Sequence, residues 1–393
     1  MVHGLEARAT GGWTMDVDGV LLSVENLCVS FFTQAGVAPA VQNVSFSIKK
    51  GQTFALVGES GCGKTTAALA IMRLLPAGQG SPCVRRGKPA PATAGVQGKI
   101  VFEGQNLLAL SEKQMRLTRG NKISMVFQEP ATSLNPVYTV GDQIAEAIQL
   151  HRNKGADQAW EDAVALLRKV GIADPERRVL EYPHRLSGGM QQRVMIAMAL
   201  SCNPALLIAD EPTTALDTTV QAQILDLLDG LQKQNGMSIL LITHNLGVAA
   251  QRADIIAVMY ASRLVEIADA VVQSRTLASD DSRQLFAPST NCSLADRPPF
   301  SGLSGTGTGS IGAGHHPYTQ GLLQSLPRVG SAVKRLQTIP GTVPDPLHLP
   351  GGCRFHPRCR AGCADTRCQT IEPVLRETQP GRWTACWRAP GYQ

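Results

Sequence analysis

The segment from Gly58 to Thr65 restricts the fold of this chain more than any other part of the sequence. It reads Gly-Glu-Ser-Gly-Cys-Gly-Lys-Thr, which is the pattern G-x-x-x-x-G-K-[ST]. An apolar run, Thr53 to Val57, precedes it, and a helix-forming run, Thr66 to Ile71, follows it. Glycines let backbone N–H groups curl around phosphates, and the following helix points its positive end at them. The sequence therefore predicts a strand, a phosphate-binding loop and a helix.

The ligand expected at this loop is a nucleoside triphosphate. Lys64 supplies a point charge to the β- and γ-phosphates, and the hydroxyl of Thr65 can ligate Mg²⁺. The predicted nucleotide-binding residues of the loop are Gly58, Glu59, Ser60, Gly61, Cys62, Gly63, Lys64, Thr65 and Thr66.

Bulk properties are those of a globular protein. The chain has 393 residues, enough for about two or three domains, with 43% hydrophobic and 17% charged residues. The net charge of +6 is too small to indicate nucleic-acid binding, so no nucleic-acid partner is predicted. There is no apolar run long enough to span a bilayer, and the N-terminal segment lacks the apolar core of a secretory signal. We therefore expect the chain to lie in a reducing compartment.

Apolar runs at 53–57, 205–209 and 238–243 are predicted to be central parallel strands. Runs without polar alternation are typical of strands that are buried on both faces. Each run ends directly in a polar motif, and ligands of open α/β sheets bind beyond the carboxyl ends of the strands. The three motifs are therefore expected to meet at one site. Apolar residues at helical spacing between 140 and 170 predict helix.

Asp210 and Glu211 follow the strand at 205–209. Phosphoryl transfer to water needs one acid to hold Mg²⁺ and another to orient or deprotonate the water. We predict that Asp210 has the first role and Glu211 the second, although an acidic pair can also simply cap a helix. His244 directly follows the strand at 238–243 and is predicted to form hydrogen bonds with the γ-phosphate and the attacking water.

Gln128 stands at the end of a predicted strand, Ile123 to Phe127. A glutamine in this place can ligate Mg²⁺ and contact the water while it lies on a mobile loop. Taken alone, a glutamine carries almost no information. We predict Thr65, Gln128 and Asp210 as the Mg²⁺ ligands, and Glu211, His244 and Gln128 as the catalytic residues.

A second predicted anion-binding helix start lies between Leu186 and Arg193. A serine and two glycines open a helix there, so a hydroxyl and helix N–H groups can bind an anion. The alternative is an ordinary N-cap followed by a turn. Two phosphate-binding helix ends in one chain indicate that two chains share the nucleotide. The predicted residues are Ser187, Gly188, Gly189 and Gln191.

With these motifs in this order, residues 21–270 resemble the nucleotide-binding subunit of an ATP-binding cassette (ABC) transporter. The resemblance implies an α/β P-loop NTPase fold with a helical signature subdomain at about 130–200 and an antiparallel β subdomain. It also implies that two subunits dimerise head to tail and trap two ATP molecules. The matching motifs are Gly58 to Thr65 (Walker A), Gln128 (Q-loop), Leu186 to Gln191 (signature), Leu206 to Glu211 (Walker B), Ala215 to Asp217 (D-loop) and His244 (switch histidine).

Three further stretches, 127–136, 316–323 and 352–359, resemble the dipeptide/oligopeptide importer subfamily. This resemblance implies an ATP-hydrolysing subunit that drives peptide import. Its implied partners are a second ATPase subunit, identical or homologous, two transmembrane permease subunits and an extracytoplasmic peptide-binding protein. The implied location is peripheral, on the cytoplasmic face of the plasma membrane. An alternative is the same role for another solute, such as nickel or a glutathione-like compound.

Cysteines cluster at the C-terminus, which holds five of the ten. In a reducing compartment, clustered cysteines favour a metal over disulfides. By resemblance, Cys353, Cys359, Cys368 and Cys386 are predicted to hold a [4Fe–4S] cluster. Zn²⁺ in a Cys₄ site and free cysteines are the alternatives, and Cys363 leaves the third ligand open.

The expected domain order has four parts. Residues 1–20 form an N-terminal tail, 21–270 the nucleotide-binding domain, and 271–316 a flexible linker that is rich in glycine between 301 and 314. Residues 317–393 are expected to form a small Cys-rich C-terminal extension.

Overall fold

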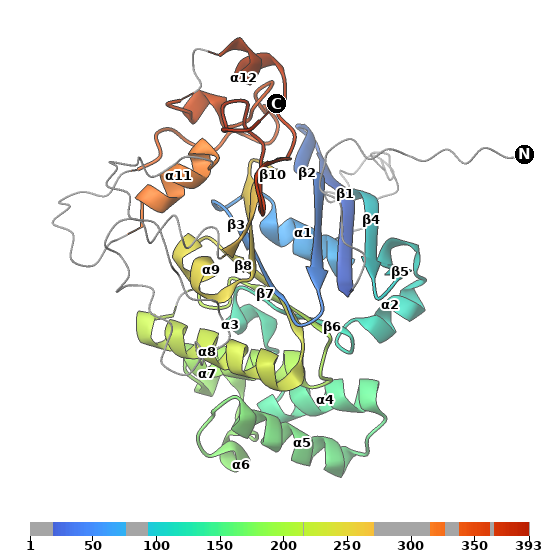
Figure 1. Ribbon diagram of the computed structural model, residues 1–393. Helices are drawn as coiled ribbons and strands as arrows, with labels where there is room; N and C mark the ends of the chain where they lie inside the picture. Colours follow the sequence, from blue (N-terminus) through green and yellow to red (C-terminus); the bar gives the residue numbers. More distant parts are fainter. Residues whose placement is uncertain are drawn as a thin grey trace, which may run out of the picture.

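The computed structural model describes residues 19–75, 93–214, 216–270, 315–326, 338–361 and 365–392. Within these ranges the strands form two sheets, of eight and of four strands (Figure 1). The larger has the order β11-β12-β10-β9-β3-β8-β7-β6 and the smaller β2-β1-β4-β5. Helices pack on these sheets, so the architecture is mixed α/β, as predicted.

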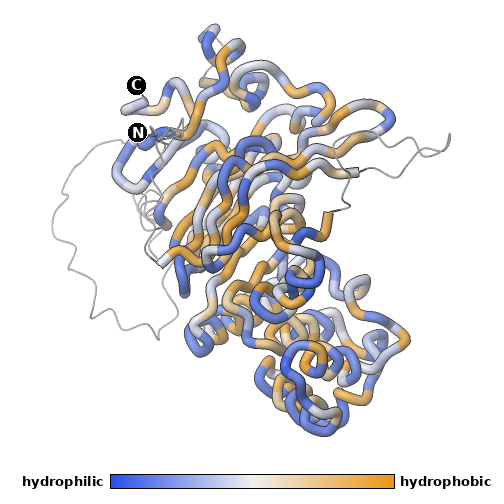
Figure 2. Tube along the Cα trace, turned by 90° about the vertical axis from the view of Figure 1, so that its right-hand side faces the viewer, coloured by the Kyte–Doolittle hydropathy of each residue, from blue (hydrophilic) through white to orange (hydrophobic). Residues whose placement is uncertain are grey.

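The centre of the larger sheet is parallel. Strand β3 (Thr53–Val57) lies between β8 (Ser238–Thr243) and β9 (Ile255–Tyr260). Strand β7 (Leu206–Asp210) pairs with β8 and with β6 (Ile123–Val126). Every residue of β3, β6, β7 and β8 is buried. This burial explains the unbroken apolar runs. Figure 2 shows hydrophobic stretches in the centre of the molecule.

Strand β3 separates two hydrophobic cores. Ala55 and Val57 face one core, which they share with helices of the signature region, and Phe54 and Leu56 face the other. The second core lies between the two sheets, where the rings of Phe46 and Phe54 stack with centroids 4.8 Å apart. The strand is therefore fixed on both faces, which leaves its carboxyl end as a rigid support for the loop that follows.

The smaller sheet is antiparallel, in accordance with the predicted antiparallel β subdomain. Strands β1 (Val20–Thr33) and β2 (Gly36–Lys49) form a long hairpin. Strand β4 (Thr93–Phe102) pairs with β1 on one side and with the short β5 (Gln105–Asn106) on the other.

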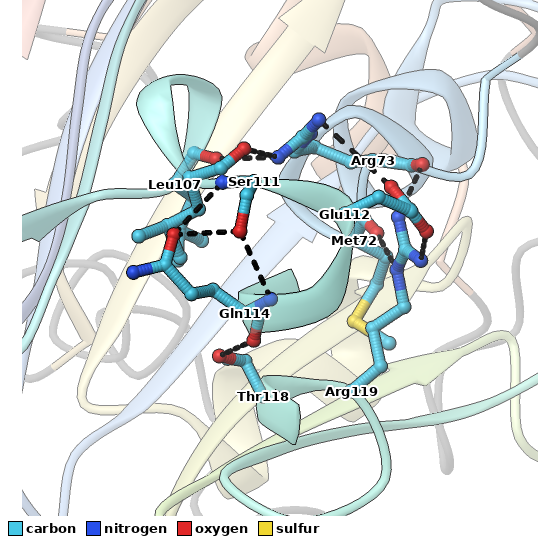
Figure 3. Close-up of polar contacts among 9 residues, drawn as sticks. Met72, Arg73, Leu107, Ser111, Glu112, Gln114, Thr118 and Arg119 are labelled. Carbon is cyan, nitrogen blue, oxygen red and sulfur yellow. Dashed lines mark hydrogen bonds and ion pairs between the residues drawn. The ribbon is translucent and has the colours of Figure 1, made fainter. Parts of the chain in front are cut away.

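Helix α1 (Lys64–Ile71) follows the glycine-rich loop, and side chains hold its carboxyl end (Figure 3). Arg119 donates to the carbonyl oxygens of Met72 (2.7 Å) and Arg73 (2.8 Å). Arg73 donates to the carbonyl oxygen of Leu107, the first residue of η1 (Leu107–Ala109), over 3.1 Å and to that of Leu110 over 2.7 Å. Helix α2 (Glu112–Thr118), which precedes Arg119, begins with a capping box. These contacts satisfy carbonyls that the end of a helix leaves free, so α1 is anchored at the end remote from the loop.

The helical region comprises α3 (Pro130–Ser133), α4 (Val140–Arg152), α5 (Ala156–Lys169), α6 (Pro175–Arg178), η2 (Pro183–Arg185) and α7 (Gly188–Leu200). These elements cover the range predicted for the helical subdomain. The helical pattern between 140 and 170 belongs to two helices, because the chain turns at Asn153 with a φ of 51°. Helices α8 (Thr218–Asn235) and α9 (Leu246–Arg252) follow β7 and β8.

The C-terminal segments contain α11 (Pro317–Gln324), η5 (His356–Arg358), α12 (Thr366–Thr370), β11 (Arg376–Gln379) and β12 (Arg382–Thr384). Strand β12 pairs with β10 (Arg263–Asp269) and so continues the larger sheet. Tyr318, Leu323 and Phe355 belong to the same hydrophobic core as the signature helices. The C-terminal segments are thus packed directly on the cassette.

Several sequence predictions lie outside the described residues. They are most of the N-terminal tail, Ala215 of the predicted D-loop and nearly all of the predicted linker, 271–314. None of the helices in the described ranges combines the length and hydrophobicity that a membrane crossing requires.

Candidate nucleotide-binding site

A cavity of about 580 Å³ lies beyond the carboxyl ends of β3, β6, β7 and β8. The motifs that follow these strands in the sequence meet around it, as predicted from the parallel-strand pattern. Its lining residues are Ala40, Glu59, Ser60, Gly61, Gly63, Lys64, Thr65, Thr66, Gln128, Glu211, His244 and Leu322.

The glycine-rich loop forms one wall of the cavity, and two of its glycines are required by close packing. A Cβ at Gly58 would lie 2.2 Å from the carbonyl oxygen of Met259, and one at Gly63 would lie 2.0 Å from that of Ala40. Gly63 also has a φ of 105°, which L-residues with a side chain rarely adopt. The loop can therefore follow this path only with glycine at both positions.

Lys64 is only 4% exposed, and its ammonium group is held within the loop. Its Nζ donates to the carbonyl oxygens of Gly58 (2.7 Å) and Glu59 (3.0 Å). Gly58, Cys62 and Asp210 are buried beneath the cavity and do not line it. Burial raises the pKa of the Cys62 thiol, although neighbouring Lys64 lowers it in part. Cys62 is thus a neutral packing group of the loop at neutral pH.

Thr65 and Asp210, the predicted Mg²⁺ ligands from two distant motifs, are in contact. The Thr65 hydroxyl donates to Asp210 Oδ1 over 3.1 Å. Burial raises the pKa of the Asp210 carboxyl above its ordinary value, an effect that the bond from Thr65 partly offsets. A hydroxyl and a carboxylate are oxygen ligands that suit Mg²⁺, and a cation would offset the cost of a buried carboxylate charge. The residues present therefore fit a magnesium ion.

The carboxylate of Glu211 contacts the other two predicted catalytic residues, Gln128 and His244. Its Oε2 accepts from Thr214 Oγ1 (2.8 Å) and Gln128 Nε2 (3.3 Å), and it lies 3.2 Å from His244 Nδ1. The Glu211 side chain is 12% exposed, so one carboxylate is held at the edge of the cavity. Glu211 has a φ of 45°, and its N–H donates to the carbonyl of Ile242 in β8. This combination can orient a water molecule and accept its proton.

The signature residues Ser187, Gly188, Gly189 and Gln191 do not line this cavity. Ser187 is the N-cap of α7, and its hydroxyl accepts from Met190 N–H over 3.4 Å. Gln191 donates to the carbonyls of Pro183 and Leu186, so its amide holds the preceding turn. The N-terminus of a helix of 13 residues is thus available away from the first phosphate site of the same chain.

The four cysteines predicted to bind a cluster line one small cavity, together with His316 and Phe355. In the described part of the chain, however, no group of three or more His, Cys, Asp or Glu side chains could hold a metal ion. Burial raises the pKa of Cys353 to about 12 and that of Cys386 to about 11 when no metal is bound. The described residues therefore give no support for the predicted [4Fe–4S] cluster or for the alternative zinc ion. Residue 363 lies outside the described ranges.

Sequence reasoning missed several residues of the site. Ala40 from β2 and Leu322 from α11 line the cavity, and Tyr318 and Arg358 contact the loop from the C-terminal segments. Tyr318, Leu322 and Arg358 lie in the stretches 316–323 and 352–359, which were recognised only for their resemblance to the importer subfamily. Their contacts with the nucleotide site were not predicted, because each contact is with a distant part of the sequence.

Comparisons with known proteins identify the family to which the chain is similar. Residues 41–214 match the family described as ABC transporter, and residues 311–368 match the oligopeptide/dipeptide transporter, C-terminal region. The probable peptide ABC transporter ATP-binding protein y4tR of Sinorhizobium fredii is 45% identical over 94% of this chain and 95% of its own length. The oligopeptide transport ATP-binding protein AppD of Bacillus subtilis is 44% identical over 93% of this chain and 96% of its own.

A third relative and a solved structure extend the comparison. The dipeptide transport ATP-binding protein DppD of Escherichia coli is 42% identical over 93% of this chain and 96% of its own. The ATP-binding cassette MJ0796, solved as a dimer bound to ADP and Pi, is 25% identical with a TM-score of 0.54. That match covers 63% of this chain and 98% of the cassette, and it confirms the predicted cassette fold. The chain is therefore an ABC ATPase, and it belongs to the ABC transporter ATP-binding proteins that carry the oligopeptide/dipeptide transporter C-terminal region.

Proposed function

We propose that this chain hydrolyses ATP to drive the import of dipeptides or oligopeptides across the cytoplasmic membrane. The observation that carries the chemistry is the position of Glu211, which faces the same cavity as Lys64 and is bonded by Gln128. The peptide cargo is supported by relatives that match nearly the whole chain and are named peptide, oligopeptide or dipeptide transport proteins.

We assign the reaction to the residues as follows. Backbone N–H groups of the loop and the Lys64 ammonium bind the β- and γ-phosphates. Thr65, Asp210 and Gln128 would hold Mg²⁺, which would supply charge neutralisation for the phosphates. Glu211 accepts a proton from the water that attacks the γ-phosphorus. The bond between the γ-phosphorus and the oxygen that bridges the β- and γ-phosphates breaks, which releases ADP and phosphate. His244 orients the water and the γ-phosphate.

The second half of each site comes from a second ATPase subunit, identical or homologous. Ser187, Gly188, Gly189 and Gln191 begin α7 outside the cavity formed by the loop of the same chain. In a head-to-tail dimer, the positive end of this helix meets the γ-phosphate bound to the partner. The dimeric state of the cassette MJ0796 supports this arrangement.

Two permease subunits and an extracytoplasmic peptide-binding protein complete the proposed importer. Two large apolar side chains, Val137 and Tyr138, are 71% and 54% exposed in the segment between α3 and α4. This segment follows Gln128 closely in the sequence, so a partner docked there would sense movement of the Gln128 loop. We assign this surface to the permeases, which places the chain at the cytoplasmic face of the membrane.

Reconstitution of the chain with its cognate permeases and binding protein in proteoliposomes tests the proposal. We expect uptake of labelled peptide that requires ATP and the binding protein and that stops with Glu211→Gln. Uptake of nickel or a glutathione-like compound without peptide uptake would refute the cargo while leaving the ATPase role intact.

A further inference from the structure

The C-terminal segments reach the phosphate-binding loop through two side chains. Arg358 forms a bidentate pair with Glu59: Nη1 donates to Oε2 over 2.7 Å, and Nη2 donates to Oε1 over 3.1 Å. The hydroxyl of Tyr318 accepts from the Glu59 N–H over 2.9 Å. Glu59 is the second residue of the loop and lines the nucleotide cavity. Its backbone and its carboxylate are therefore both fixed by residues more than 250 positions later in the chain.

The orientation of Arg358 is set by contacts other than the one with Glu59. Its Nε donates to the carbonyl of Pro340 over 2.8 Å, and its Nη1 lies 3.3 Å from the Tyr260 hydroxyl. The guanidinium also lies 5.7 Å from the centre of the Tyr260 ring. The Arg358 side chain is only 6% exposed. A bidentate pair held in this way differs from an exposed ion pair, whose side chains lose freedom for little gain.

Tyr318 is equally well fixed. It is fully buried, and its ring packs against Tyr260 and Phe355, with centroids 4.6 and 5.5 Å away. The rings of Tyr260 and Phe355 contact each other at 5.2 Å. Tyr260 ends β9, the neighbour of β3, so the aromatic cluster connects the sheet to the C-terminal segments.

The contacts with Glu59 also help to fix the position of the Lys64 ammonium, the group proposed to bind phosphate. The Glu59 N–H held by Tyr318 belongs to the same peptide unit as the Gly58 carbonyl, which accepts from Lys64 Nζ over 2.7 Å. The Glu59 carbonyl accepts from Lys64 Nζ over 3.0 Å. A shift of the backbone at Glu59 therefore moves both acceptors that hold the ammonium. The Glu59 carboxylate also adds a negative charge to a loop that must receive a triphosphate. Arg358 cancels this charge without contacting the cavity floor formed by Lys64 and Thr65.

We propose that Arg358 and Tyr318 are positioning residues for ATP. They hold the Glu59 end of the loop in its phosphate-binding shape and neutralise the Glu59 charge. Through these two residues, the C-terminal segments contribute to nucleotide binding. This inference rests on the assignment of ATP to the Gly58–Thr66 loop. It differs from a purely structural role, in which the pair only docks the C-terminal segments.

The test uses the full chain with its permeases and measures the Kd of a fluorescent ATP analogue, together with kcat and KM for ATP. Because charge-assisted bonds are lost, we expect Arg358→Ala to raise Kd and KM about tenfold while kcat changes less than about twofold. Arg358→Lys restores part of the affinity, because it keeps the charge without the bidentate geometry. Tyr318→Phe raises Kd by roughly threefold, because one neutral hydrogen bond is lost.

A double variant separates positioning from docking. In Arg358→Ala the Glu59 carboxylate is left without its partner, and the further substitution Glu59→Gln removes that charge. If Arg358 acts by neutralising Glu59, the double variant Glu59→Gln/Arg358→Ala should bind ATP with a Kd within about twofold of that of Glu59→Gln alone. The matched control is Arg367→Ala, which breaks an exposed pair with Asp365 in the same region and should leave Kd unchanged. Thermal melting confirms that each variant is folded at the assay temperature.

Two results would overturn the proposal, and they are distinguishable. If Arg358→Ala and Tyr318→Phe bind ATP within twofold of wild type while Lys64→Ala loses binding, the nucleotide site stands and the positioning role fails. If Lys64→Ala itself binds ATP normally, the assignment of ATP to the loop fails, and this inference fails with it.

Discussion

The hydroxyl of Thr65 donates a 3.1 Å hydrogen bond to Asp210, which joins the helix after β3 to the end of β7. Strand β8 lies between these two strands, so the contact spans the carboxyl edge of the sheet. Both side chains were predicted as Mg²⁺ ligands from motifs 145 residues apart. Their contact brings the two predicted Mg²⁺ ligands together at one edge of the sheet, as a shared metal site requires.

Substitution of this carboxylate should change the response to magnesium. Asp210→Asn removes the charge that a cation would stabilise, so we expect the Mg²⁺ concentration for half-maximal ATPase activity to rise at least about tenfold. Titration of the steady-state rate with Mg²⁺ at fixed ATP measures this. The control is Asp226→Asn, whose carboxylate is 59% exposed and pairs with Arg252 away from the site. An unchanged magnesium midpoint in Asp210→Asn would remove this residue from the metal site.

Loss of the proposed base should separate ATP binding from turnover. In Glu211→Gln the side chain keeps its shape and an oxygen that can accept from Gln128 and Thr214, but it cannot take a proton from water. We therefore expect kcat to fall by about 10²- to 10⁴-fold. ATP binding should persist, and ATP-dependent dimers should accumulate, which light scattering detects. Turnover at the wild-type rate would show that another group deprotonates the water.

Two glycine-to-alanine substitutions should have opposite effects. In Gly58→Ala the new Cβ would lie 2.2 Å from the Met259 carbonyl oxygen, so the loop must move, and we expect nucleotide binding to be lost. In Gly230→Ala, within α8, the new Cβ meets nothing within 4 Å, and the helix gains about 1 kcal/mol of stability. Thermal melting and nucleotide titration of both variants check this pair. Normal binding by Gly58→Ala would mean that the loop is not closely packed on β9.

The stability of the chain should fall as the pH falls from about 6.5 to 4. His316 is buried, and burial lowers its pKa from 6.5 to about 4, although nearby Glu266 opposes the shift. In this pH range the unfolded chain binds a proton that the folded chain excludes, which lowers the free energy of unfolding by about 3 kcal/mol. Below pH 4 this contribution is constant.

The matched variant for this pH effect is His316→Asn. His316 is the N-cap of α11, and its Nδ1 accepts from Tyr318 N–H, so asparagine keeps the cap but does not titrate. The hydrogen bond between His315 and Glu266 is retained in both proteins. Denaturant unfolding at pH 7 and pH 4.5 should show a smaller loss in His316→Asn. Equal losses would exclude His316 as the source.

Local patterns in the sequence were sufficient to predict the centre of the site. Thr53 to Val57 forms the predicted strand, and the strand predicted at 205–209 is displaced by only one residue. These runs are interpretable because burial on both faces imposes an apolar composition that no other short element needs. The helical pattern at 140–170 gave the correct element type but not the break at Asn153, because the apolar spacing continues across it.

The sequence by itself determined the loop that carries Lys64, the strand ends followed by Glu211 and His244, the position of Asp210, and the helical start at Ser187. Each of these depends on a local pattern of residues. Only the tertiary structure decided that Arg358 and Tyr318 hold Glu59, and that β12 extends the central sheet through β10. It also decided that cysteines with a metal-like spacing do not form a metal-binding group in the described chain. Such contacts depend on how distant segments pack in three dimensions, and packing between distant segments leaves no periodicity in the sequence.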